Sequence, residues 1–156
     1  RKTVENAVKG RVPAFFSPNF SLGINILFKM IQLCKLFPAG YDFSIVEAHH
    51  AGKIDAPSGT AEKLGELVSN LRKYTEKVYG RKGMSKRKGN EVEILSVRGG
   101  GIPGIHDLII AGQNEMIKIE HIAFSRSVFA QGALYATEWL YNQVEPRIYT
   151  MDDLLK

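Results

Sequence analysis

The chain has 156 residues, of which 44% are hydrophobic and 24% charged, with 15 glycines and 6 prolines. This composition is that of an ordinary globular protein, and it excludes collagen-like, low-complexity and wholly disordered chains. The single cysteine, Cys34, can form neither an internal disulfide nor a multi-cysteine metal site, so we expect a reduced, cytoplasmic setting. The most apolar stretch, residues 22–36, is interrupted by polar side chains and is too polar to span a bilayer.

The net charge of +5 comes from one stretch of the chain. Residues 72–88 contain eight basic side chains and a single acidic one, Glu76. The basic residues are Arg72, Lys73, Lys77, Arg81, Lys82, Lys86, Arg87 and Lys88. A cluster of this kind attracts anions, and it is compatible with nucleic acid, with an anionic metabolite or with a solvated loop.

In chain order, the first half predicts two strands that each precede a helix. Residues 1–9 have the pattern of the end of a helix, and residues 12–16 predict a short strand. Residues 21–36 predict a helix that is apolar on most sides and therefore buried. Residues 41–46 alternate as a strand that places Tyr41, Phe43 and Ile45 on one face.

The second half predicts an amphipathic helix at 61–79, a basic glycine-punctuated loop at 80–90, and strands at 91–98, 106–111 and 116–123. The glycine run 99–104 would join the first two of these strands, which look antiparallel, and residues 112–114 would form a tight turn. A last helix at 127–142 would face inward through Val128, Phe129, Leu134, Thr137 and Tyr141. This order predicts an α+β fold with a mixed β-sheet of about four strands packed with helices.

The densest concentration of functional side chains lies at residues 47–60, between a strand and a helix. Ser58, Gly59 and Thr60 precede the amphipathic helix, whose first amides and dipole can bind a carboxylate or phosphate. Gly59 would let such a ligand approach the backbone closely. The alternative is that Ser58 or Thr60 only caps the helix.

In the same segment, His49 and His50 are adjacent, and Lys53 follows three residues later. Imidazoles and an ammonium gathered in one pocket are suited to proton transfer near neutral pH. Glu47 and Asp55 are also ligand types for metals. However, the segment lacks the i, i+4 histidine pair of a zinc-protease helix and has no cysteine ligand, so we predict no metal site. His106 and His121, in predicted strands, are expected to make ordinary hydrogen bonds.

The motif HHxxKxDAPSGTA at 49–61 closely resembles the signature of the dihydrodipicolinate reductase family, the 4-hydroxy-tetrahydrodipicolinate reductases of lysine and diaminopimelate biosynthesis. The resemblance extends to SPNFSLGIN at 17–25, SVRGG at 96–100, HIAFSR at 121–126 and FAQGA at 129–133. Order and spacing agree over nearly the whole chain.

The resemblance implies roles for matching residues. It makes His49 and Lys53 catalytic proton donors or acceptors. It makes His50, Ser58, Gly59 and Thr60 substrate ligands, with a substrate carboxylate on Gly59 and Thr60. It assigns cofactor contacts to Ser17, Pro18, Asn19, Phe20 and Arg126. The implied reaction uses NADPH or NADH to reduce a cyclic imine dicarboxylate, 4-hydroxy-tetrahydrodipicolinate, to tetrahydrodipicolinate with loss of water.

The resemblance also implies a domain organisation and an assembly. Residues 1–20 would be a remnant of a nucleotide-binding domain with its hinge, 21–125 the substrate-binding and oligomerisation domain, and 126–156 a return to the nucleotide-binding domain. The implied assembly is a homotetramer built through the sheets. No glycine-rich phosphate loop follows a strand, and the chain begins with Arg1 rather than Met. We therefore expect the C-terminal part of a longer enzyme, lacking most of a Rossmann domain, which alone binds the dinucleotide weakly and is inactive.

Two alternatives remain at this point. The basic stretch could belong to a nucleic-acid-binding module, although no aromatic residues interleave with residues 82–88 and no recognised binding motif is present. The chain could also be a catalytically inactive structural paralogue, against which the cluster of His49, His50 and Lys53 argues.

Overall fold

A computed structural model describes residues 2–156, which divide into two compact units. One unit contains the residues up to Ile26 together with Arg126–Lys156, and the other contains Leu27–Ser125. In the part of the chain that the structure describes, no helix is long and apolar enough to cross a membrane.

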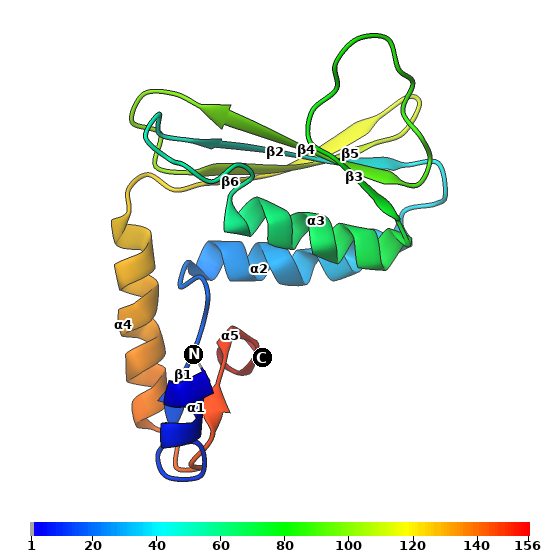
Figure 1. Ribbon diagram of the computed structural model, residues 1–156. Helices are drawn as coiled ribbons and strands as arrows, with labels where there is room; N and C mark the ends of the chain where they lie inside the picture. Colours follow the sequence, from blue (N-terminus) through cyan, green and yellow to red (C-terminus); the bar gives the residue numbers. More distant parts are fainter. Residues whose placement is uncertain (1) are drawn as a thin grey trace. The chain divides into compact units, whose positions relative to one another are not determined.

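The larger unit is built on a five-stranded mixed sheet with the strand order β3-β4-β2-β5-β6 (Figure 1). The central strand, β2, pairs in parallel with β4 and antiparallel with β5, while β6 is antiparallel to β5 and β3 is parallel to β4. The strands are β2 (Asp42–His49), β3 (Glu76–Val78), β4 (Glu91–Arg98), β5 (Ile105–Ala111) and β6 (Met116–Ile122). The predicted α+β fold with a mixed sheet is thereby confirmed.

The predicted end of the amphipathic helix is wrong. The amphipathic helix α3 (Gly59–Arg72) does not continue to residue 79, because Lys73 adopts the left-handed conformation with φ 58° and ends it. The chain then turns back and forms the fifth strand, β3. The glycine run 99–104 joins β4 to β5, and these two strands run antiparallel, as predicted, with β2 lying between them.

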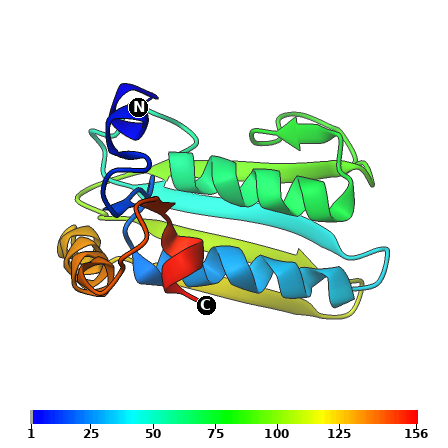
Figure 2. The ribbon, with the colours of Figure 1, turned by 90° about the horizontal axis from the view of Figure 1, so that it is seen from below.

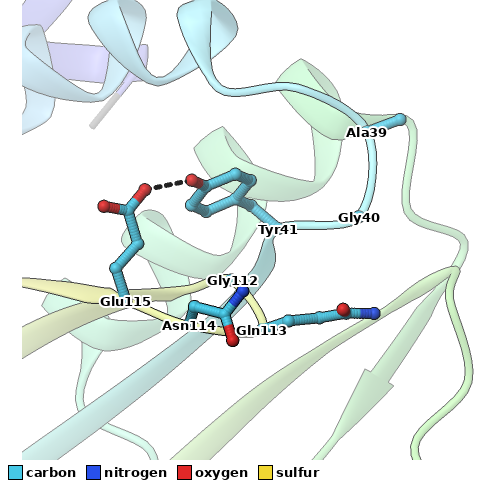
Figure 3. A pocket seen from close by; sticks show the side chains of 7 residues that line it. All are labelled: Ala39, Gly40, Tyr41, Gly112, Gln113, Asn114 and Glu115. Carbon is cyan, nitrogen blue, oxygen red and sulfur yellow. Dashed lines mark hydrogen bonds between the residues drawn. The ribbon is translucent and has the colours of Figure 1, made fainter.

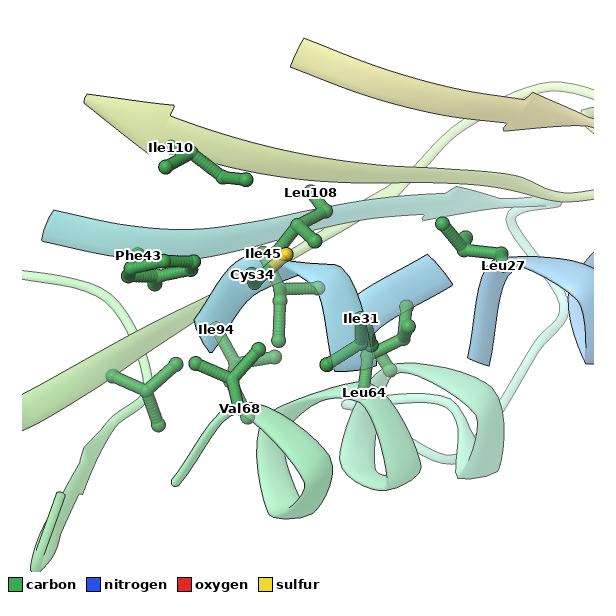
Figure 4. Packing of buried hydrophobic residues seen from close by; sticks show 12 residues of the cluster. Leu27, Ile31, Cys34, Phe43, Ile45, Leu64, Val68, Ile94, Leu108 and Ile110 are labelled. Atoms are coloured by element: carbon green, nitrogen blue, oxygen red, sulfur yellow. The ribbon is translucent and has the colours of Figure 1, made fainter. Parts of the chain in front are cut away.

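One face of this sheet carries the hydrophobic core (Figure 4). The helix α3 and residues 27–36 run along this face (Figure 2). The latter residues form the end of α2 (Leu22–Met30) and the 3-10 helix η1 (Ile31–Leu36), so the predicted helix 21–36 changes type at Met30. The buried cluster consists of Leu27, Ile31, Cys34, Phe43, Ile45, Ala61, Leu64, Val68, Val92, Ile94, Leu108 and Ile110.

The other face of the sheet is more exposed. On it, Val97, Ala48, Ile105 and Ile122 are paired in register across β4, β2, β5 and β6. Val97 and Ile122 are 49% and 43% exposed. Lys118 on β6 forms ion pairs with Asp107 and Glu120, at 3.0 and 2.7 Å. This face therefore combines an apolar row with a charged cluster.

The smaller unit contains α1 (Lys2–Val8), α4 (Ser127–Tyr141), α5 (Met151–Leu154) and a parallel pair of short strands, β1 (Ala14–Phe15) and β7 (Ile148–Tyr149). Trp139 packs edge-on against Phe15 and Tyr149. The predicted inward face of α4 is wrong, since Phe129, Leu134 and Tyr141 are 37%, 65% and 89% exposed and Thr137 is also exposed. Val128 is half-buried.

The buried face of α4 is instead made by small residues, Gly132 and Ala136, one turn apart. A Cβ atom on Gly132 would lie only 1.8 Å from the backbone oxygen of Phe20. Close approach of the helix to this backbone is therefore what selects glycine here, and it rotates the bulkier apolar side chains away from the contact.

Candidate active site

The candidate site lies on the same face of the sheet as the hydrophobic core, where polar side chains follow the apolar ones along the strands. Ile94, Ile45, Leu108 and Ile119 form an apolar row across β4, β2, β5 and β6. Two residues further along β2 on the same face, the row is Ser96, Glu47, His106 and His121. The next pair is His49 and Arg98. Because β2 ends at His49, these polar side chains gather where the strand leads into the 50–58 loop and α3.

Glu47 lies at the centre of this cluster, and its side chain is fully buried. Its carboxylate accepts two hydrogen bonds from the guanidinium of Arg98, at 2.7 and 2.9 Å. It also contacts Nδ1 of His49 at 2.5 Å and accepts a hydrogen bond from the amide of Ser58 at 3.1 Å. Glu47 thus connects β2, β4 and the start of α3.

The electrostatics of Glu47 follow from these contacts. Burial by itself raises the pKa of the Glu47 carboxyl, but hydrogen bonds from Arg98, His49, Ser96 and the Ser58 amide outweigh burial and lower the pKa to about 2. The same ion pair raises the pKa of Arg98. Glu47 is therefore a carboxylate, and a hydrogen-bond acceptor only, at neutral pH.

His106 lies beside Glu47 and is almost fully buried. Its Nε2 is 3.2 Å from the hydroxyl oxygen of Ser58, and its ring centroid is 5.1 Å from that of His49. Burial, followed by the positive charge on His49 and His121 when they are protonated, lowers the pKa of His106 to about 4. His106 is therefore neutral at physiological pH, and the expected ordinary hydrogen bond is present.

The start of α3 is capped by Ser58, and the backbone beside it at Gly59 is open to a ligand. The Ser58 side chain accepts a hydrogen bond from the Ala61 amide at 3.3 Å, so Ser58 does cap the helix. Ser58 is buried, with its amide and hydroxyl engaged by Glu47 and His106. At Gly59 a Cβ atom would meet nothing within 4 Å, so a ligand can approach the first turn of α3 beside Gly59 and Thr60.

The loop between β2 and α3 carries the other predicted residues. The ammonium of Lys53 pairs with Asp55 at 2.7 Å, and its side chain is 21% exposed. Arg98 donates to the backbone oxygen of Asp55 at 2.6 Å, which ties this loop to β4 and, through Arg98, to Glu47. His50 begins the turn, where its carbonyl oxygen accepts the amide of Lys53 at 3.1 Å.

The residues predicted to contact the cofactor lie in the smaller unit. Ser17, Pro18 and Asn19 form a turn in which the Ser17 hydroxyl donates to the Asn19 carbonyl oxygen at 2.6 Å. The Asn19 side chain in turn accepts the Ser21 amide at 2.8 Å. Phe20 contributes its backbone to the contact with Gly132, and Arg126 is exposed at the start of α4.

A hollow at the opposite end of β2 does not involve these residues (Figure 3). It is lined by Ala39, Gly40, Tyr41, Gly112, Gln113, Asn114 and Glu115. The Tyr41 hydroxyl donates to the Glu115 carboxylate, and this hydrogen bond raises the pKa of Tyr41. The hollow lacks the histidines and lysine that distinguish the other end of the strand.

Most of the basic stretch is engaged within the protein. Lys77, Arg81, Arg87 and Lys88 pair with carboxylates, and Arg72 donates to the backbone oxygens of Phe37 and Pro38. Their carboxylate partners are Glu62, Glu91, Asp42 and Glu76. The positive charge is therefore largely balanced locally, which removes most of the support for a nucleic-acid-binding surface.

Three participants were not predicted as site residues, namely Glu47, Arg98 and His106. A signal for Glu47 was present, since it follows Phe43 and Ile45 at the period-2 spacing of a buried face, where a carboxylate needs partners. Arg98 and His106 could be recognised only from strand pairing. Among residues 2–156, no group of three or more His, Cys, Asp or Glu side chains could hold a metal ion.

Comparisons with known proteins identify the family to which the chain belongs. Residues 23–155 match the family model described as dihydrodipicolinate reductase, C-terminus. The 4-hydroxy-tetrahydrodipicolinate reductase of Methanosarcina mazei is 46% identical over 156 residues, which are 99% of this chain and 59% of the relative. That of Caldanaerobacter subterraneus is 48% identical over 157 residues, 99% of this chain and 62% of the relative.

The fold is shared with a solved structure as well. The dipicolinate-bound dihydrodipicolinate reductase from Paenisporosarcina sp. TG-14 superposes with a TM-score of 0.69 at 23% identity, covering 94% of this chain and 54% of that one. The chain thus spans about three-fifths of the length of the curated relatives it matches. The resemblance seen in the sequence is confirmed, and the chain belongs to the dihydrodipicolinate reductase family, of which it matches the C-terminal part.

Proposed function

We propose that this chain carries the substrate-binding and catalytic residues of a 4-hydroxy-tetrahydrodipicolinate reductase acting in lysine and diaminopimelate biosynthesis. The observation that carries the proposal is the convergence of His49, the start of α3 and the Lys53 loop on one buried carboxylate, Glu47. The family match and the names of the relatives support the same reaction.

The chemistry of the site suits a cyclic imine dicarboxylate. One substrate carboxylate would bind at the first turn of α3, beside Gly59 and Thr60, where helix amides and the helix dipole favour an anion. Ser58 would act by capping α3 and holding it against Glu47. The second carboxylate would lie toward His50 and Lys53. His49 or Lys53 would supply the proton that accompanies the reduction, and water would leave the ring.

NADPH or NADH would supply the hydride when bound, and residues 2–156 would form only part of the dinucleotide site. Neither β1 nor β7 is followed by a glycine-rich phosphate loop. The short helix after β7 uses Thr150 and Asp153 in its own capping box, and Asp152 and Asp153 would repel a pyrophosphate. Ser17, Pro18, Asn19, Phe20 and Arg126 would therefore complete a cofactor site formed mainly by a nucleotide-binding domain.

The organisation of the chain follows from the same proposal. Residues 1–20 and 126–156 would belong with the nucleotide-binding domain, and residues 21–125 would form the substrate and oligomerisation domain. The two compact units support this division. We propose that the reaction takes place in the cytoplasm, which the buried free thiol of Cys34 supports.

We further propose a homotetramer assembled through the sheets. The row of Val97, Ala48, Ile105 and Ile122 leaves apolar surface on the face opposite the core, and Met116 and Ile117 on the edge strand β6 are 61% and 45% exposed. Covering such a face and edge with further copies of the chain would remove apolar surface and unpaired strand groups from water.

The binding proposal is tested by calorimetric titration with pyridine-2,6-dicarboxylate, the ligand named for the Paenisporosarcina enzyme. Pyridine-2-carboxylate, which lacks one carboxylate, is the matched control. We expect saturable binding of the dicarboxylate and at least tenfold weaker binding of the monocarboxylate. Equal affinity for the two ligands would contradict a site that holds both carboxylates.

A further inference from the structure

We propose that Glu47 is a positioning residue that fixes the ring of His49 as the tautomer protonated at Nδ1, so that Nε2 is the atom that exchanges a proton. This inference rests on the proposed function for its catalytic meaning, although the tautomer itself can be measured without any reaction.

The first step of the argument is the geometry of the pair. Nδ1 of His49 lies 2.5 Å from Oε2 of Glu47, and the two side chains are 12% and 0% exposed. Because Glu47 is a carboxylate at neutral pH, it can only accept, so the hydrogen of the neutral imidazole must be on Nδ1. The Glu47 side chain has no exposure to solvent, so the carboxylate meets His49 without bulk water around it.

The second step concerns the other ring nitrogen. A Cβ atom at Gly104 would lie 3.3 Å from Nε2 of His49 and 3.8 Å from the ring of His106. Because Gly104 has no side chain, there is space beside Nε2 of His49 that the Cβ atom of any other residue would reduce. With Nδ1 bound to Glu47, Nε2 is the ring nitrogen that remains for a substrate.

The third step is that each hydrogen-bond partner of the Glu47 carboxylate acts as a donor to it. Arg98 and Ser96 approach from β4, the Ser58 amide from the start of α3, and His49 from the end of β2. Neutral His106 lies beside them on β5, and Lys53 and Asp55 face the cluster from the loop. The Arg98 cation balances the charge of the Glu47 carboxylate, which has no proton to donate and can therefore only accept the Nδ1–H of His49.

This donor arrangement makes Glu47→Gln a sharp test. A glutamine must turn its NH2 group toward one pair of neighbours. If the NH2 group takes the position of Oε2, one hydrogen bond from Arg98 is lost. The NH2 group can then donate to Nδ1 of His49, provided that the hydrogen of the imidazole is on Nε2. If the NH2 group takes the position of Oε1, it faces two other donors, the Ser58 amide and Arg98, and both of their hydrogen bonds are lost. The first arrangement loses less, so we expect the variant to switch the tautomer of His49.

The measurement is the long-range nitrogen–proton NMR spectrum of the four histidines in the chain at pH 8, which separates protonated from unprotonated ring nitrogens. We expect His49 protonated at Nδ1 in the unmodified chain and at Nε2 in Glu47→Gln. Glu66→Gln, on the exposed side of α3, is the matched control and should leave His49 unchanged. Finding Nε2–H in the unmodified chain would overturn the proposal without any variant, and so would an unchanged tautomer in a folded Glu47→Gln.

A second readout separates this inference from the proposed function. In a reductase containing the whole of this sequence, Glu47→Gln should lower kcat on the order of 100-fold with KM little changed, because the misplaced hydrogen affects proton transfer rather than binding. If the tautomer switches as expected but kcat does not fall, the positioning role of Glu47 stands and the catalytic role of His49 is wrong.

Discussion

The burial of His106 predicts that the chain loses stability on mild acidification, and His106→Gln should remove much of that loss. The His106 side chain has Nε2 within hydrogen-bond distance of the Ser58 hydroxyl, while its Nδ1 is buried without a hydrogen-bond partner among the described residues. A second ring proton on this histidine therefore has no favourable place in the fold. Glutamine cannot titrate, and its side-chain oxygen can still accept the Ser58 hydroxyl.

The magnitude follows from the pKa of His106, which is about 4 in the folded chain against an ordinary 6.5. Because the folded pKa is lowered, the unfolded chain takes up the proton first as the pH falls. The free energy of unfolding therefore decreases between pH 6.5 and about 4. From these two values the loss is about 2 kcal/mol at pH 5. Glu47 contributes little in this range, since its stabilising ionisation is lost only between pH 4.5 and about 2.

The assay is urea unfolding followed by circular dichroism at pH 7 and pH 5. We expect the unmodified chain to lose about 2 kcal/mol more than His106→Gln over this interval. The comparison between variants cancels contributions from the other histidines, including His121, whose pKa burial also lowers. Equal losses in the two proteins would refute the assignment of a buried, neutral His106.

Two further predictions concern the close contact of α4 and the proposed catalytic lysine. Gly132→Ala places a Cβ atom 1.8 Å from the backbone oxygen of Phe20, so it should lower the free energy of unfolding by about 3 kcal/mol in a urea titration. Gly89→Ala is the control, because a Cβ atom there meets open space, and it should leave the free energy of unfolding nearly unchanged. A stable Gly132→Ala chain with normal amide protection in α4 would show that the contact is not close. In a reductase that contains the whole of this sequence, Lys53→Ala should lower turnover on the order of 100-fold while calorimetry finds dinucleotide binding preserved. Lys63→Ala, on the exposed side of α3, is the control, and equal turnover in the two variants would remove Lys53 from the mechanism.

Local patterns in the sequence predicted the strands and helices that build the site. The alternation around Phe43 and Ile45 identified β2, and Pro57 with Ser58 located the start of α3. These features depend on residues close together in the chain, so periodicity and capping preferences reveal them. The His49 and Lys53 segment was recognisable for the same reason, because it lies between the two elements.

The pairing of strands could not be obtained in this way. β2 lies between β4 and β5, so Glu47 meets Arg98 from one side and His106 from the other, more than forty residues away along the chain. Nothing local distinguishes this order from a meander in which β4 and β5 are neighbours. The end of α3 was missed because Lys73, not a glycine, adopts the left-handed conformation there.

The inward face of α4 was also misjudged, and for a different reason. Hydrophobic periodicity selected Phe129, Leu134 and Tyr141, but the contact is made by Gly132 and Ala136, whose small size allows close approach. A pattern that scores apolar bulk cannot detect a contact that depends on the absence of a side chain.

The central claim is that the start of α3, next to Glu47 and His49, binds a dicarboxylate. The most direct test is a titration of the nitrogen-15-labelled chain with pyridine-2,6-dicarboxylate, followed through backbone amide shifts. We predict saturable shifts at Gly59 and Thr60 together with the ring of His49, and none at Gly112 or Gln113 in the hollow at the far end of the sheet. Shifts confined to that hollow, or no saturable shift at Gly59 and Thr60 at millimolar ligand, would contradict the account.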